Sequence, residues 1–176
     1  MNHTTQKGRN PMQTFTSSAT SINRSKLPAV YRRAKLTAPA VLDYGCGKYT
    51  DHIWQYVNRS YYPYDPYNQP DEVNASTMRN VQRHVSEHIP LDVVCSNVLN
   101  VIDDDDEIQR IVRNIEEIVR LTGGHAFFTV YEGDRSEIGK KTGKDQYQRN
   151  DVLSSYIRFF TLSVTIKNNM IIIGGN

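Results

Sequence analysis

The stretch AVLDYGCGKYTDHIWQYV, residues 40–57, decides the fold of this chain. It begins with an apolar run, 40–45, continues through an acid and two glycines, and passes into a segment of helical character, 51–57, that begins at Asp51. A short apolar run bounded by turn residues is typical of a buried strand, and glycine permits a tight backbone turn. The stretch therefore predicts a strand, a sharp turn and a helix, which is a building unit of parallel α/β sheets.

Strands and helices continue to alternate after this stretch. Further buried strands are predicted at 60–65, 91–99 and 125–131 from their apolar or aromatic runs. Residues 103–124 form the clearest helix, because acidic residues open it where the helix dipole favours negative charge and a glycine pair ends it. Pro63 lacks a backbone N–H, so the 60–65 strand belongs at an edge of the sheet or contains a bulge.

Two further helices are predicted nearer the ends of the chain. Residues 23–36 predict a helix with Ser25 as its cap and Pro28 in its first turn. Residues 151–160 predict another, with Asp151 as its cap.

Two internal segments have no clear pattern. Residues 132–149 are polar, lysine-rich and contain glycine, which is typical of a long loop. Residues 71–90 show neither a convincing strand nor a long helix, and a short helix over 78–85 and a missing strand are both open alternatives. The chain then ends with a predicted hairpin that turns at Asn168–Asn169.

This order of elements predicts an α/β fold: a Rossmann-like, mostly parallel sheet with helices on both faces and a C-terminal antiparallel hairpin. The length of 176 residues suits a single domain, which we assign to 22–176. Residues 1–21 contain almost no large apolar side chains, so we expect them to form a disordered, basic N-terminal arm.

Charge is distributed unevenly along the chain. Seven of the 21 basic side chains lie within residues 1–40, whereas all 19 acidic side chains follow residue 40. A basic arm on an acidic body indicates contact with nucleic acid or, as the alternative, a flexible solvated leader. The two cysteines, Cys46 and Cys95, are too few for a disulfide framework. With no membrane span and no export signal in the sequence, we expect a cytoplasmic protein.

The glycine turn indicates which ligand the fold would hold. Its sequence from Gly45, GCGKYT, lacks the third glycine of the dinucleotide fingerprint, so a pyrophosphate fits poorly. Asp43 precedes the turn and would repel a pyrophosphate, but it suits a positively charged group. Asp65 closes the next strand, where a carboxylate takes the two hydroxyls of a ribose. An adenosine with an amino-acid tail and no phosphates fits both acids.

The combination of VLDYGCG, residues 41–47, with the acid of YYPYDPY, residues 61–67, resembles the class I S-adenosylmethionine-dependent methyltransferases. Their first motif has the form acid-x-Gly-x-Gly, and an acid after the second strand holds the ribose. The resemblance extends over about residues 40–131 and includes LDVVCSNVLNVI and LTGGHAFFTV. It is nearest to a subgroup of small bacterial and phage methyltransferase-like proteins, some associated with DNA modification, whose N-terminal segment is similar to TSINRSKLP.

The resemblance implies S-adenosyl-L-methionine as cofactor and a methyl acceptor that the sequence does not identify. It implies no metal, and no catalytic residue can be named. The chain departs from the family pattern at two places: Tyr49 occupies the position of the third glycine, and no strand can be recognised within 71–90, where the family has its third strand. The implied cofactor-binding residues are Asp43, Tyr44, Gly45, Cys46, Gly47, Asp65, Pro66, Asn97 and Val98.

Several alternatives remain open for the function. The chain is either an active methyltransferase or a catalytically inactive methyltransferase-like binding module, in the second case with a nucleic acid among its partners. Asn97 either lines the site or caps a turn. The 132–149 loop has glycines that suit a lid, and its lysines 140, 141 and 144 would favour an anionic acceptor. Three rim residues after the 125–131 strand either face the site or are solvated: Tyr131, Glu132 and Asp134.

Three other motifs fail because of their context. DPYN, residues 65–68, looks like the catalytic motif of DNA amino-methyltransferases, but it stands in the ribose position. Cys95 lies within an apolar strand, so we expect a packed thiol rather than a nucleophile. His84 and His88 have the spacing of a metal pair but no third ligand nearby.

Overall fold

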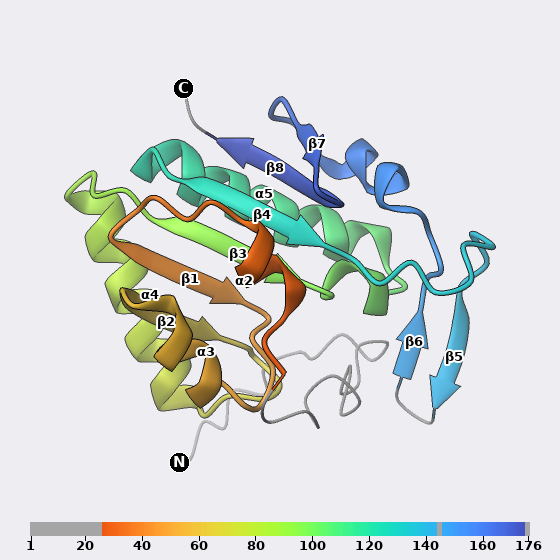
Figure 1. Cartoon of the computed structure of the whole chain (residues 1–176), viewed down its shortest axis with the longest axis horizontal. Coiled ribbons are helices and arrows are strands. Elements are labelled where there is room, and N and C mark those ends of the chain that lie inside the picture. The colour runs from red at the N-terminus through yellow and green to blue at the C-terminus, as the bar shows by residue number, and fades with distance from the viewer. Residues whose placement is uncertain (1–25, 144–145, 175–176) are drawn as a thin grey trace, which may run out of the picture.

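The computed structural model describes residues 26–143 and 146–174, in which helices flank a six-stranded mixed sheet and a two-stranded hairpin lies at one side (Figure 1). The elements, in chain order, are α2 (Ala29–Arg33), β1 (Ala40–Tyr44), α3 (Asp51–Val57), β2 (Ser60–Tyr64), α4 (Asp71–Ser86), β3 (Asp92–Ser96), η1 (Leu99–Val101), α5 (Asp105–Thr122), β4 (His125–Thr129), β5 (Lys140–Gly143), β6 (Gln146–Gln148), η2 (Leu153–Phe159), β7 (Thr165–Lys167) and β8 (Met170–Gly174).

The main sheet has the strand order β2-β1-β3-β4-β8-β7. The first four strands are mutually parallel, whereas β8 is antiparallel to both β4 and β7. The predicted α/β class with a mostly parallel sheet is therefore confirmed, and so is the C-terminal hairpin. The strand order reverses between β1 and β3, and in open α/β sheets ligands bind at such a switch point, beyond the carboxyl ends of the strands.

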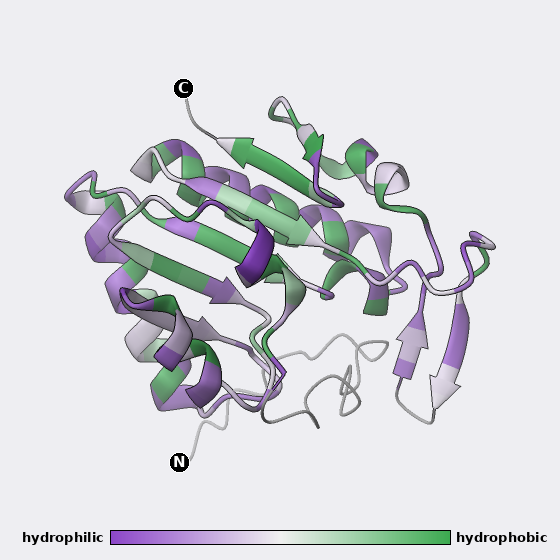
Figure 2. Cartoon of the chain, viewed as in Figure 1, coloured by the Kyte–Doolittle hydropathy of each residue, from purple (hydrophilic) through white to green (hydrophobic). Residues whose placement is uncertain are grey.

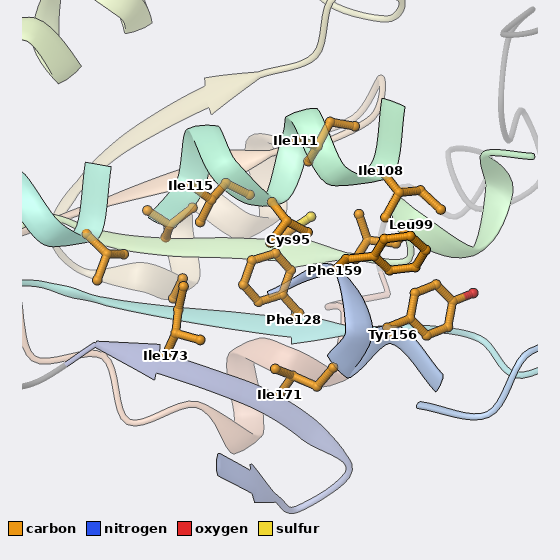
Figure 3. Close-up of a cluster of buried hydrophobic side chains, with 14 of the residues drawn as sticks. Cys95, Leu99, Ile108, Ile111, Ile115, Phe128, Tyr156, Phe159, Ile171 and Ile173 are labelled. Atoms are coloured by element: carbon orange, nitrogen blue, oxygen red, sulfur yellow. The ribbon is translucent and has the colours of Figure 1, made fainter. Parts of the chain in front are cut away.

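Each face of the sheet buries its own apolar cluster. The larger cluster lies under α4, α5 and η2, and Figure 3 shows its side chains converging from α5, from the central strands and from η2. The smaller cluster lies under α2 and α3 on the opposite face, and it includes Val41, Val94 and Phe127 from three neighbouring strands. Because successive side chains of a strand point to opposite faces, Asp43 shares the α2 side with Val41.

The boundaries of α5 follow from its sequence, as predicted. Asp104 caps the helix and accepts hydrogen bonds from the backbone N–H groups of Asp106 and Glu107. An apolar stripe along α5 is buried against the sheet. Gly123 ends the helix with φ = 73°, in the left-handed conformation that favours glycine.

The β2 strand is an edge strand, as Pro63 predicts, and its outer side is closed to a further strand. Pro63 has no N–H to donate, and its carbonyl oxygen accepts a hydrogen bond from the Thr77 hydroxyl at 2.6 Å. Residues 71–86 form the 16-residue helix α4. The prediction of no long helix in this segment was therefore wrong, and among the described residues no strand lies outside β2.

Three other predictions need correction. The helix predicted over 23–36 is the short α2, for which Pro28 is the N-cap residue. The segment 132–149 contains the hairpin β5–β6 rather than only a loop. The helix predicted over 151–160 is the 3₁₀ helix η2, and the residue before its first turn is Val152 rather than Asp151.

Some predictions lie outside the described residues, namely those on residues 1–21, Ser25 and Lys144. Within the described ranges, no helix has the length and apolar character needed to cross a lipid bilayer. The hairpin turn at Asn168–Asn169 is present, with φ = 52° and 56° at the two asparagines. These positive values match the turn type that joins two strands tightly.

Candidate functional site

The glycine turn lies at the carboxyl end of β1, beside the switch point. Gly45 and Gly47 have φ = 80° and 74°, a conformation that side chains other than glycine rarely adopt. The backbone N–H groups of Gly45 and Cys46 both donate to the Tyr64 carbonyl oxygen, at 2.7 and 3.2 Å. The turn therefore bends toward the end of β2, as a tight strand-to-helix connection requires.

A glycine is also required at position 45 because the Val98 side chain packs directly against it. A Cβ atom at this position would come within 2.3 Å of the Val98 Cγ2 atom. Val98 follows β3, so the predicted residues of the glycine turn and of the β3 end are in direct contact. The rings of Tyr44 and Tyr64 pack at 5.0 Å on the other face of the sheet, and Tyr44 belongs to the margin of the larger apolar cluster.

Asp43 lies deeper than a simple rim residue. Its side chain is buried, and its Oδ2 atom accepts a hydrogen bond from the Tyr61 hydroxyl at 2.7 Å. Burial raises the pKa of Asp43 to about 6, because the charged form is poorly solvated, and the hydrogen bond from Tyr61 offsets this only in part. Asp43 thus carries a proton more readily than an exposed aspartate.

Asp65 connects the two loops of the site. Its Oδ2 atom accepts hydrogen bonds from the backbone N–H of Gly47 at 2.9 Å and from the Asn68 side-chain amide at 3.1 Å. Its Oδ1 atom accepts hydrogen bonds from the backbone N–H groups of Tyr67 and Asn68, at 2.9 and 3.0 Å. Gln69 adds a second link, since its side-chain amide donates to the Gly47 carbonyl oxygen at 2.7 Å. Four donors match the roughly four acceptor positions of a carboxylate.

The remaining predicted residues lie around this pair of loops. Pro66 is exposed in the turn that follows Asp65. Asn97 has φ = 57°, and its backbone N–H donates to the Thr129 carbonyl oxygen at 2.8 Å. It therefore makes the turn at the end of β3 and, half-buried, also stands beside the switch point. The Cys46 thiol is half-buried, 3.5 Å from the Gly47 carbonyl oxygen.

The other side chains named from the sequence have mainly structural contacts. Glu132 accepts a hydrogen bond from the backbone N–H of Leu153 at 2.7 Å, and Asp134 forms an ion pair with Lys140 at 2.9 Å. Tyr131 is exposed. These contacts fix the segment after β4, and they partly neutralise the lysine cluster that was predicted to meet an anionic acceptor.

Two of the three motifs judged unlikely for chemistry have structural settings. Cys95 is buried in β3, and burial raises the pKa of its thiol. His84 is buried on α4, with its ring nitrogens 3.4 Å from the Tyr62 hydroxyl and 3.2 Å from the Ile89 carbonyl oxygen. Among the described residues, no group of three or more histidine, cysteine or acidic side chains is placed to hold a metal ion.

One polar network near the site was not predicted. Arg149 follows β6, and its guanidinium donates to the Ile102 carbonyl oxygen at 3.0 Å and pairs with Asp105 and Asp151. The Asn100 side-chain amide donates to Gln148 at 3.2 Å. Together these bonds fasten the β5–β6 hairpin to η1, beyond the end of β3. No local sequence pattern predicts the network, because all of these bonds except the Arg149–Asp151 pair join residues more than 40 positions apart.

We also compared the chain with known proteins. Neither a protein-family model, nor a curated protein, nor a solved structure matches it.

Proposed function

We propose that this chain binds S-adenosyl-L-methionine at the carboxyl edge of β1 and β2 and transfers its methyl group to an acceptor. One observation carries the proposal. The glycine turn lies beside the switch point, close to the two acids at the ends of the adjacent parallel strands β1 and β2. The backbone N–H of Gly47 donates a hydrogen bond to the Asp65 carboxylate at 2.9 Å. This supports the cofactor site that the resemblance implies.

The chemistry of the residues fits the cofactor. Two carboxylates, at Asp43 and Asp65, lie close to the glycine turn, which disfavours a pyrophosphate and suits a ligand with hydroxyl and ammonium groups. In the structure Asp65 already accepts four hydrogen bonds from the chain itself. Binding of a ribose therefore requires Asp65 to exchange one or two of these donors for ribose hydroxyls.

The proposed roles of the residues follow from their contacts. The cofactor, when bound, supplies an electrophilic methyl group on a sulfonium, so the chain mainly has to orient the acceptor and exclude water. Asp65 would hold the ribose, and the turn of Gly45 and Gly47 would allow close approach of the backbone. The hairpin β5–β6, fastened by Arg149, would limit access of water from the side of η1.

A second function is favoured by one specific observation. The fully hydrogen-bonded carboxylate of Asp65 is what a purely architectural acid would also show. The alternative is therefore a methyltransferase-like module that binds a partner, nucleic acid included, and transfers nothing. In either case, the free thiols of Cys46 and Cys95 fit the reducing cytoplasm that we propose as the compartment.

Calorimetric titration separates these functions. We expect heat on adding S-adenosylmethionine or S-adenosylhomocysteine to the full chain, and prior addition of ATP should not reduce this heat, because the two acids repel its phosphates from this site. A second step, incubation with radiolabelled S-adenosylmethionine and candidate acceptors, tests transfer. Binding without transfer to any acceptor favours the inactive module, and absence of heat with both sulfur ligands contradicts the cofactor assignment.

A further inference from the structure

The face of the sheet that α2 covers holds a hollow of about 390 Å³ outside the candidate cofactor site. Its floor is apolar and consists of Phe127 on β4 and of Met170 and Ile172 on β8. Figure 2 shows the strongly hydrophilic α2 in front of the sheet and the apolar strand β8 uncovered on the viewer's side. The hollow thus lies where the covering helices of this face end.

The rim of the hollow is basic. Arg33 is the last residue of α2, Lys35 lies two positions after it, and Lys167 is the last residue of β7. All three are exposed, and no acidic side chain lines the hollow. None of the three takes part in a salt bridge within the described ranges. By contrast, six other basic side chains there do have acidic partners: Arg110, Arg120, Arg135, Lys140, Arg149 and Arg158.

A buried acid fixes the walls of the hollow from below. The Asp92 carboxylate accepts hydrogen bonds from the backbone N–H groups of Thr37 and Ala38, at 2.6 and 2.9 Å. It also accepts one from the backbone N–H of His125 at 3.0 Å. Asp92 is fully buried, so it holds the segment after Lys35 against the start of β4 without placing its own charge in the hollow.

His125 extends the rim of the hollow. Its side chain lines the hollow and is one-third exposed, while its Nδ1 atom is buried 3.6 Å from the Asp92 carboxylate. Asp92 therefore faces the Nδ1 edge of the ring, and the opposite edge is left for a ligand. The His125 and Phe127 rings are stacked at 6.2 Å, which gives the floor a flat surface.

We propose that this hollow binds a phosphate group, carried by a small phosphorylated molecule or by a nucleic-acid backbone. The three rim cations have no acidic partners, so a ligand with a higher negative charge interacts with them more favourably. A carboxylate carries one negative charge, whereas a phosphate carries close to two. The Arg33 guanidinium has the planar fork that bonds phosphate oxygens in pairs. The site uses neither the glycine turn nor Asp65, so it is independent of the proposed cofactor.

The test compares two probes on the full chain. Sodium pyrophosphate is titrated by calorimetry, and fluorescent single- and double-stranded DNA of about 20 nucleotides is titrated by anisotropy at about 50 and 200 mM salt. The double variant Arg33→Gln/Lys167→Gln removes two rim cations. A matched control, Arg79→Gln/Arg113→Gln, removes two exposed cations from α4 and α5. Thermal melting of all three proteins checks that they are folded.

We expect the rim variant to weaken pyrophosphate binding by about tenfold or more, and the control variant by less than about twofold. If a nucleic acid supplies the phosphate, DNA binds at the lower salt and the rim variant reduces the slope of log affinity against log salt by about 1 to 2. Binding of pyrophosphate alone identifies a small phosphorylated ligand. No binding of either probe, or equal losses in the rim and control variants, overturns the proposal.

Discussion

Asp65 at the carboxyl edge of the sheet and Asp92 at its amino edge are two versions of one arrangement. Each is a buried aspartate that accepts backbone N–H groups from neighbouring loops. The donors to Asp92 belong to segments 33 or more positions away in the sequence, whereas three of the four donors to Asp65 belong to Tyr67 and Asn68 in its own turn.

This difference indicates that Asp92 has a structural role, whereas Asp65 is a candidate for ligand binding. The bonds of Asp92 hold whole elements together, so they cannot open without disturbing the sheet. The bonds of Asp65 are mostly local to one surface turn, so they can open at a modest cost and expose a carboxylate beside the glycine loop. A motif position alone does not distinguish the two cases, but variants at the two positions do.

The largest effect is expected at Asp92. Replacing it by alanine removes the fully buried carboxylate that accepts hydrogen bonds from three backbone N–H groups. Asp92→Ala should therefore lower the free energy of unfolding by about 3 to 5 kcal/mol. Urea denaturation measures this, with Glu87→Ala, an exposed acid at the end of α4, as a control expected within about 0.5 kcal/mol of wild type. If Asp92→Ala lowers the free energy of unfolding by less than about 1 kcal/mol, the hydrogen bonds of Asp92 do not hold the elements of the sheet together as we infer.

Asp43 is a third buried carboxylate, and it should make the free energy of unfolding depend on pH. Its pKa is raised from 3.8 to about 6 in the fold, so the folded state binds a proton more tightly than the unfolded state. The resulting stabilisation is fully present below pH 3.8 and is lost as the pH rises through about 6. The difference corresponds to about 3 kcal/mol.

The variant Asp43→Asn removes this titration. Relative to wild type, its free energy of unfolding should be about 2.5 kcal/mol higher at pH 8 than at pH 4, because wild type at pH 4 retains most of the stabilisation and at pH 8 none of it. Urea denaturation of both proteins at several pH values tests the difference, which cancels the titration of other groups. A difference that does not change with pH means that Asp43 keeps an ordinary pKa despite its burial.

The elements near the glycine turn were predictable because local signals agree there. The apolar run of β1, the glycines and the start of α3 at Asp51 need no distant partner to be recognised. The helix α4 was missed because two of its three buried residues, Thr77 and His84, are polar, so its inner face has no apolar stripe. Those side chains become meaningful only once Pro63 and Tyr62 of β2 lie beside them.

Two other errors have different causes. The buried residues of η2, Leu153, Tyr156 and Phe159, recur every three positions, which is the 3₁₀ period, and this signal was present in the sequence. The strand β5 offered none, since all four of its residues are exposed. The role of Asp92 was equally invisible, because an acid at the start of an apolar strand does not reveal which N–H groups will reach it.

The comparison is tested directly at Asp65. Asp65→Asn keeps one acceptor oxygen but loses the charge, so we expect a loss of about 1 to 2 kcal/mol in the free energy of unfolding. If Asp65 also accepts ribose hydroxyls, the variant should bind S-adenosylmethionine about 10 to 100 times more weakly by calorimetry. Asp71→Asn, an exposed acid at the start of α4, serves as the control. If Asp65→Asn lowers stability but leaves the affinity for S-adenosylmethionine unchanged, Asp65 has only a structural role, as Asp92 does.

The smallest effect, and the sharpest, is expected at Asn68. Its side-chain amide occupies one acceptor position on Asp65 Oδ2, while its backbone N–H bonds the other oxygen and stays in place in Asn68→Ala. The variant should cost about 0.5 to 1 kcal/mol of stability. Because binding then displaces one donor fewer, S-adenosylmethionine should bind about two to five times more tightly.

A matched control separates this gain from a general loosening of the fold. Asn80→Ala also removes a side-chain amide hydrogen bond, to the Ser76 carbonyl oxygen on α4, and should leave the affinity unchanged. In the double variant Asp65→Asn/Asn68→Ala the gain should disappear, since the carboxylate it depends on is gone. If Asn68→Ala binds S-adenosylmethionine like wild type while Asp65→Asn binds it weakly, Asp65 acts by holding the Gly47 loop in place rather than by accepting the ribose hydroxyls.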